Sequence, residues 1–327
     1  MPKEITHFAL ANKLSRSVPV TSAFYEPIQR YPFLFLLGAV TPDIPFYYLA
    51  GPHRKKVQEL SRPFHRSDAK SLDPVLDFID TDRSLQALAL AAGVVCHIMS
   101  DTRFHPFVYY YSGMDGIHSG ATGRHRQFET AMDIHFWFLF QGETSLSRVL
   151  SQTGISRQRL VRLLSGLFRP GPLGENALGR ALRWHSGIQY LFGISEIYRA
   201  FKGFARLGRP LPEKVSGLVY PFDRPRPLDF FSRQIRYQDP FTGESISTTI
   251  QSMTNLVVES ELSVLDNISC ALSENGESSN IKTLKDRVLS DPCLPTVRPD
   301  LPADRFGTWF QQQDIMPLLY QGTDSVI

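Results

Sequence analysis

The pattern of apolar and polar positions predicts a chain built mainly from helices. The clearest helix covers Ser84–Ser100, because Asp80-Thr-Asp before it suits an N-terminal cap and Leu88-Ala-Leu-Ala-Ala consists of strong helix formers. Tyr31–Val40 is apolar nearly all round and is therefore a buried helix or a buried strand. Further helices are predicted over Ile5–Ser15, Gly123–Phe140, Ser145–Phe168, Glu175–Arg206 and Ser247–Ser273.

The segments between these helices are predicted to be loops. Tyr109-Tyr-Tyr-Ser-Gly is expected in a loop, Arg209–Glu244 is rich in proline and charge and reads as an irregular connector, and Ser273–Asn280 reads as a mobile loop. No alternating pattern persists over several segments and no internal repeat is visible. The expected fold class is therefore all-α, with little β structure.

Composition narrows the class of protein. The 327 residues are 42% hydrophobic and 12% aromatic, which excludes a mainly disordered chain. A net charge of +3 argues against a strongly basic nucleic-acid-binding protein. The three cysteines are far apart and form no Cys-x-x-Cys pair, so any metal must be held by histidine and carboxylate. The start lacks the apolar stretch of a secretory signal, and the apolar stretches are shorter than the roughly 18 residues that span a bilayer. We expect a cytoplasmic protein that can contact membranes at its surface.

The histidines are concentrated in the first part of the chain. Uniform placement would put roughly five of the nine after position 135, but only His185 lies there. The other eight are His7, His53, His65, His97, His105, His118, His125 and His135. Because histidine is both the commonest metal ligand and a frequent acid or base, this concentration indicates a site.

Two histidines have an acid four residues later, a spacing that places both side chains on one helix face. His97 precedes Asp101 near the end of an apolar helix, and His125 precedes Glu129 at the start of another. About one such pair is expected by chance, but ionisable groups on a buried helix face need a partner or a metal. Taken singly, Asp43 reads as a turn residue, His7 as a core histidine and His65 as a surface residue.

The order of these motifs resembles the zinc-dependent phospholipase C family. The series is Thr-His-x-x-x-Ala at His7, Gly-Ala-x-x-Pro-Asp at Asp43, a loop histidine, His-x-x-x-Asp at His97 and His-x-x-x-Glu at His125. The resemblance covers roughly residues 1–140. It implies an all-α bundle with a zinc cluster in a cleft, a metal-binding core over residues 1–140 and a C-terminal helical extension over 141–327 that packs on the core.

The resemblance also implies ligands. Asp43, His65, His97 and Asp101 would hold one zinc, with Asp101 bridging to another. His125 and Glu129 would hold a second zinc with His105, or with His118 as the alternative, and His7 would bind a third beside Asp101. Secreted relatives complete the third site with the amino terminus of the mature enzyme, which begins with tryptophan, whereas this chain starts Met-Pro. Two or three Zn²⁺ ions are therefore expected.

The function implied is hydrolysis of a phosphodiester by zinc-activated water, most naturally phospholipase C-type cleavage of a phospholipid, with Asp43 as the base. Zinc nucleases share the fold and cluster, so a nuclease or another phosphoesterase is the alternative, and a non-catalytic zinc-stabilised helical protein is a third. No G-x-S-x-G motif or phosphate-binding glycine loop points to a different chemistry.

Overall fold

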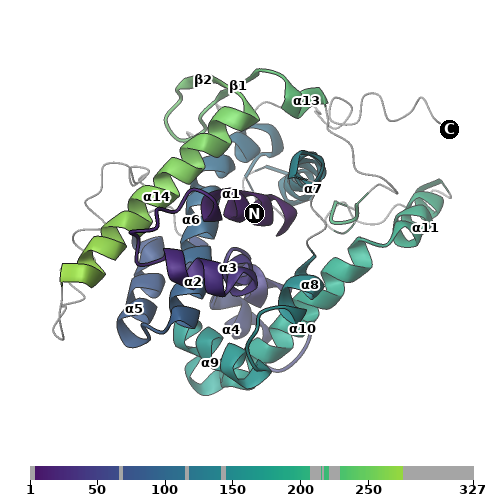
Figure 1. Cartoon of the computed structure of the whole chain (residues 1–327). Helices are drawn as coiled ribbons and strands as arrows, with labels where there is room; N and C mark the ends of the chain where they lie inside the picture. Colours follow the sequence, from purple (N-terminus) through teal and green to yellow (C-terminus); the bar gives the residue numbers. More distant parts are fainter. Residues whose placement is uncertain are drawn as a thin grey trace.

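A long central helix organises the fold. The computed structural model describes residues 4–65, 69–114, 118–140, 145–206, 215, 217–220 and 229–274. Helix α6 (Leu85–Ser112) contacts α1, α2, α3, α5, α7 and α14, which pack around it (Figure 1). Its N-terminus is capped by Ser84, whose side chain accepts a hydrogen bond from the Ala87 N–H. The fold is an all-α bundle, as the sequence predicts.

The elements follow one another with short connections. Their bounds are α1 (Glu4–Ser15), α2 (Tyr25–Arg30), α3 (Pro32–Gly38), the 3₁₀ helix η1 (Thr41–Tyr47), α4 (Arg54–Glu59), η2 (Arg62–His65), η3 (Ala69–Leu72), α5 (Asp73–Thr81), α6, α7 (Ala121–Phe140), α8 (Leu146–Ser151), α9 (Arg157–Phe168), η4 (Gly171–Leu173), α10 (Glu175–Phe192), α11 (Ser195–Arg206), α13 (Asp229–Ser232), β1 (Ile235–Gln238), β2 (Ser245–Thr248) and α14 (Ile250–Glu274).

Three of the predicted segments differ in detail. Helix α6 continues through the expected loop at Tyr109, because Phe104, Phe107 and Tyr111 keep helical spacing and are buried; the helix ends at Gly113, whose φ is +78°. The expected helix over Ser145–Phe168 is divided into α8 and α9 around Gly154, which has a φ of +71°. The expected helix over Glu175–Arg206 is divided into α10 and α11, which are separated by Gly193 and Ile194. Apolar spacing alone therefore located the helices but not all of their ends.

The expected connector Arg209–Glu244 contains regular structure in its described part. Strand β1 lies within it and pairs antiparallel with β2, so that Ile235 faces Thr248 and Gln238 faces Ser245. These are the only strands among the described residues. Most of the expected mobile loop over Ser273–Asn280 lies outside the described residues.

Two glycines allow α3 and α6 to touch backbone to backbone. A Cβ atom on Gly93 would lie 2.0 Å from the Phe35 carbonyl oxygen, and one on Gly38 would lie 2.2 Å from the Leu90 carbonyl oxygen. No side chain fits at this crossing. The close approach places the start of η1, directly after α3, against the part of α6 that carries His97.

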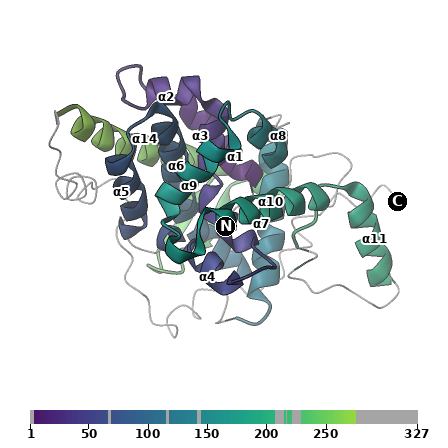
Figure 2. The same ribbon diagram turned by 90° about the horizontal axis from the view of Figure 1, so that it is seen from below.

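The helices after residue 140 surround this bundle. Helix α14 packs on α6 and α1, and α10 packs on η1 and α9, whereas α11 extends away from the body in both views (Figures 1 and 2). By length and composition α6 is apolar enough to cross a membrane, but 83% of its most apolar window is buried inside the structure. Burial of this kind is what the core helix of a bundle also shows.

Candidate metal centre

The eight predicted ligands come from five separate elements and meet in one region. Their donor atoms form three groups, within each of which all atoms lie within 4.8 Å of one another. The groups are His7, Asp43 and His97; His65, His97 and Asp101; and His105, His125 and Glu129.

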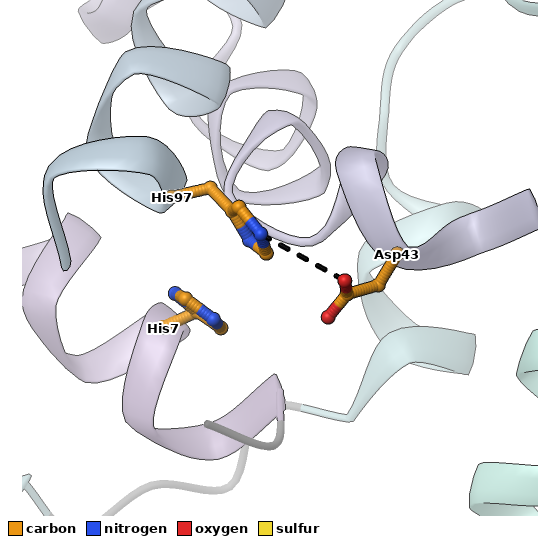
Figure 3. A group of neighbouring side chains, drawn as sticks. All are labelled: His7, Asp43 and His97. Atoms are coloured by element: carbon orange, nitrogen blue, oxygen red, sulfur yellow. Dashed lines mark ion pairs between the residues drawn. The ribbon is translucent and has the colours of Figure 1, made fainter. Parts of the chain in front are cut away.

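His97 is the central side chain of the first two groups. Its Nδ1 atom donates a hydrogen bond to the Ala39 carbonyl oxygen at 2.9 Å, which turns Nε2 toward Asp43 and Asp101 at 3.8 and 3.4 Å. Figure 3 shows the His97 ring opposite Asp43, with His7 beside both. The rings of His7 and His97 are stacked with centroids 4.3 Å apart. Such a second hydrogen bond is the usual device that orients a metal-binding histidine.

His65 is held in the same way. Its Nδ1 atom donates to the Ser61 carbonyl oxygen at 2.9 Å, and its Nε2 atom lies 2.9 Å from Asp43 Oδ1 and 3.3 Å from His97 Nε2. In the neutral rings both Nε2 atoms are unprotonated, so their lone pairs face each other and the carboxylates. A cation or an additional proton is needed to make this arrangement favourable.

Asp101 lies between the groups. Its Oδ1 atom is 3.5 Å from His7 Nε2 and 3.9 Å from His105 Nε2, while Oδ2 is 3.4 Å from His97 Nε2 and 3.8 Å from His65 Nε2. Beyond His105, His125 Nε2 lies 2.7 Å from Glu129 Oε1, and the His105 and His125 rings are 5.8 Å apart. The single carboxylate thus faces imidazole nitrogens on both of its oxygens.

Buried polar atoms in this cluster fit a metal. Within the described part of the chain, both nitrogens of His7, both carboxylate oxygens of Asp101 and Nε2 of His105 are buried and make no hydrogen bond. Polar atoms removed from water without a hydrogen bond destabilise a fold. Histidine nitrogen and carboxylate oxygen are the donors that zinc takes, so a bound cation would satisfy these atoms.

Burial and the neighbouring carboxylates shift the pKa values of the histidines in this cluster in opposite directions. Burial and the neighbouring His97 hold the pKa of His7 well below its ordinary value, and burial lowers the pKa of His105 to about 3. Burial acts to lower the pKa of His97 too, but Asp101 and Asp43 outweigh it and raise that pKa to about 9. Burial acts to raise the pKa of Asp101, yet His105 and His97 hold it well below its usual range.

One edge of the cluster is open to solvent. The side chains of His65, His105 and His125 keep 15%, 17% and 16% of their surface exposed, whereas His7 and His97 are almost completely buried. A catalytic metal site requires a position that water and substrate can reach, in contrast to a closed structural site.

Comparison with known proteins gives one match. Residues 6–163 match the family described as zinc dependent phospholipase C. These residues, slightly less than half of the chain, resemble the zinc-dependent phospholipase C family. No curated protein and no solved structure matches the chain.

The zinc-dependent phospholipase C match contains all eight predicted ligands and makes zinc the metal expected at the cluster. Of the two alternatives, His105 lies with His125 and Glu129, whereas His118 Nδ1 accepts a hydrogen bond from the Met114 N–H. The match ends in α9, beyond residue 140, and the division into 1–140 and 141–327 stays a prediction. The role of each residue as a ligand and the number of ions also stay predictions.

A buried network next to the zinc-dependent phospholipase C cluster was not visible in the sequence. His185 is fully buried and its Nε2 contacts Glu4 on α1, one helical turn before His7. Gln189, one turn further along α10, contacts Glu4 as well and bonds to Tyr47 on η1 at 2.9 Å. The ring of Tyr47 stacks on His185. The network therefore connects α10 to the two elements that carry His7 and Asp43. In the sequence, the only related feature is the four-residue spacing of His185 and Gln189, which places both side chains on one face of a helix.

A second buried carboxylate fixes the other side of α1. Asp133 on α7 is completely buried and accepts hydrogen bonds from the N–H groups of Ile5 and Thr6 and from the Thr6 hydroxyl. Tyr220 donates at 2.7 Å to Oδ2, the oxygen that also accepts from the Ile5 N–H, whereas both Thr6 donors bond to Oδ1. An acid at the first turn of a helix satisfies N–H groups that have no partner within the helix. Asp133 therefore holds α1, and with it His7, on the helix that carries Glu129.

Proposed function

We propose that the chain is a zinc-dependent hydrolase of phosphodiester bonds whose substrate is a phospholipid. The observation that carries the proposal is the position of Asp101, whose two oxygens face histidines of different donor groups. This arrangement suits two or three ions that share one carboxylate. The family match over residues 6–163 supports zinc as the metal and a phospholipid as the substrate.

The chemistry follows from the donor set. When bound, zinc polarises phosphoryl oxygens and lowers the pKa of water to about 7. Asp43, His65, His97 and Asp101 would hold one ion, and His105, His125 and Glu129 another. Asp43 lies in this region with a carboxylate that His65 contacts at 2.9 Å, so it would orient the attacking water and accept its proton.

Aromatic rings flank the open edge of the cluster. Phe46 lies 5.1 Å from His65 between ring centroids, and Tyr109 lies 5.1 Å from His105 and 5.5 Å from His125. Phe241 continues this wall 6.1 Å beyond Tyr109. All three rings are partly exposed and would contact the apolar part of a phospholipid. The same rings would also stack on a nucleic-acid base, so the test below includes a nuclease substrate.

The test combines metal analysis with turnover of a substrate panel. Purified protein should contain zinc and should release a phosphorylated headgroup from a short-chain phospholipid faster than it cleaves single-stranded DNA. Preference for DNA would assign the chain to the nuclease alternative. Stoichiometric zinc without turnover of any phosphodiester would assign it to the structural alternative and end the hydrolase proposal.

Asp43→Asn tests the assigned base. The substitution keeps the volume of the side chain but removes its negative charge and most of its basicity, so kcat should fall by roughly 10²–10⁴-fold. The matched control is Asp80→Asn, because Asp80 pairs with Arg83 at 3.6 Å in a solvent-accessible ion pair. Near-normal turnover by Asp43→Asn at saturating zinc would show that Asp43 is only a turn residue.

A further inference from the structure

Positive charge is concentrated in one stretch of the chain. Residues 145–206, which form α8 to α11, contain ten arginines and lysines but only two acids, a net charge of +8, whereas the whole chain has +3. The two acids are Glu175 and Glu196. An asymmetry of this size creates a positive potential over the helices that carry it, although the protein as a whole is nearly neutral.

Part of this charge is neutralised inside the fold and part is not. Arg159 bonds to Asp82 at 3.0 Å and Arg169 to Asp77 at 3.4 Å, so both pair with acids of neighbouring elements. Within the part of the chain that the structure describes, Arg157 and Arg183 have no ion pair, and Arg180 bonds only to the Tyr48 hydroxyl at 3.1 Å. Arg157 and Arg183 are exposed, and Arg180 is partly exposed.

The three arginines line two adjoining hollows. Arg157, Arg180 and Arg183 border a hollow of about 470 Å³ between α9 and α10. Arg180 and Arg183 also border a second hollow of about 340 Å³, which continues along α10 past Trp184 to Leu191. Both volumes lie in the range that holds a small polar group such as a lipid headgroup.

Large apolar side chains lie exposed on the same face of α10. The exposed fractions are 40% for Trp184, 67% for Tyr190 and 49% for Leu191. Their spacing from Arg180 and Arg183 puts all five on one stripe of the helix, because positions three, four and seven residues apart share a face. The α9–α10 surface, as we call it, consists of Arg157, Arg180, Arg183, Trp184, Tyr190 and Leu191.

We propose that the α9–α10 surface docks the protein on an anionic phospholipid bilayer. Unpaired arginines complement lipid phosphates, and tryptophan and tyrosine favour the boundary between headgroups and acyl chains. The opposite face of α10 packs on η1, which carries Asp43, so docking would hold the elements of the cluster near the bilayer. The inference rests on the proposed phospholipase function, and the surface lies almost entirely beyond the matched residues 6–163.

The experiment is flotation of the zinc-loaded full chain with phosphatidylcholine vesicles that contain or lack phosphatidylglycerol. At about 0.1 M salt, charges more than roughly 10 Å apart are screened, so only arginines close to the lipid phosphates contribute to binding. Arg157→Gln/Arg183→Gln should weaken binding to the phosphatidylglycerol vesicles roughly 25-fold, which is about fivefold for each arginine near the membrane surface. The matched control is Arg30→Gln/Arg233→Gln, which removes the same charge from two exposed side chains elsewhere.

Trp184→Ser separates the apolar contribution from charge. It should weaken binding to both kinds of vesicle, whereas Leu256→Ser, at a residue that is 51% exposed on α14, should not. The docking proposal is wrong if phosphatidylglycerol adds no affinity, or if the two arginine pairs have equal effects. It is equally wrong if the α9–α10 variants keep vesicle binding and lose a protein partner instead.

Turnover of a water-soluble phosphodiester separates this proposal from the proposed function. Arg157→Gln/Arg183→Gln should keep the turnover of that substrate while losing activity on vesicles. Vesicle binding through the α9–α10 surface without turnover of any phosphodiester would uphold docking and refute the hydrolase. Turnover of the water-soluble phosphodiester without vesicle binding would uphold the hydrolase and refute docking.

Discussion

Gly93→Ala would insert a methyl group into the crossing of α3 and α6. The added Cβ would lie 2.0 Å from the Phe35 carbonyl oxygen and 2.7 Å from Gly38 Cα, both of which belong to backbone that cannot rotate away. Contacts below 3.0 Å are not tolerated, so the two helices must separate by at least about 1 Å. The crossing lies one helical turn before His97, so the separation acts directly on the metal centre.

Two opposing terms set the effect on folding. Alanine is better than glycine in a helix interior by about 1 kcal/mol, whereas overpacking a filled core costs roughly 1–3 kcal/mol and more where backbone must move. We expect Gly93→Ala to lower the free energy of unfolding by about 1–3 kcal/mol. Separation of the helices also withdraws the Ala39 carbonyl from His97 Nδ1, now at 2.9 Å. Loss of such a supporting hydrogen bond lowers metal affinity by about 10–100-fold.

Denaturant unfolding and zinc competition against a chelator measure the two effects separately. Gly187→Ala is the matched control, because its Cβ would meet nothing within 4 Å and the substitution should raise stability by up to about 1 kcal/mol. If Gly93→Ala were as stable as Gly187→Ala and kept the zinc affinity of the unmodified chain, the close crossing would not position His97, and the reasoning would be refuted.

Two further substitutions test buried groups. His185→Ala should lower the free energy of unfolding by about 2–4 kcal/mol in denaturant titrations, because it removes a hydrogen-bond donor from the buried Glu4 carboxylate. An effect no larger than that of Arg30→Ala, at an exposed residue, would contradict this prediction. Burial raises the pKa of Glu261 well above its ordinary value, so the folded state keeps a proton that the unfolded state loses above about pH 4.5. The contribution of this bound proton to the free energy of unfolding therefore falls by about 1.4 kcal/mol for each pH unit above that point, until the pH reaches the pKa of Glu261 in the folded state. Glu261→Gln should therefore unfold at higher denaturant than the unmodified chain at pH 8 but not at pH 4, and equal shifts at both values would count against it.

Local features of the sequence predicted the helices and the two histidine–acid pairs. The four-residue spacing of His97 and Asp101 is a property of one helix, and the same holds for His125 and Glu129, so both pairs follow from periodicity alone. Periodicity did not predict the end of α6, because the aromatic run that begins at Tyr109 is followed by a serine and a glycine, which favour a turn. Burial of Phe107 and Tyr111 against α7, α13 and β1 outweighs that local preference.

The convergence of the pairs depends on contacts between residues that are far apart in the sequence. His97 meets Asp43 because Gly38 and Gly93 let two helices touch, and neither glycine carries a signal of that contact in its neighbours. His7 reaches Asp101 because Asp133, 127 residues after Thr6, holds the first turn of α1. Glu4 and His185 are 181 residues apart and each alone is an ordinary side chain. The ordered motifs that resemble the family carried information about this assembly that spacing could not. The groups that support the ligands, by contrast, are backbone contacts and buried acids, and they become visible only in the folded chain.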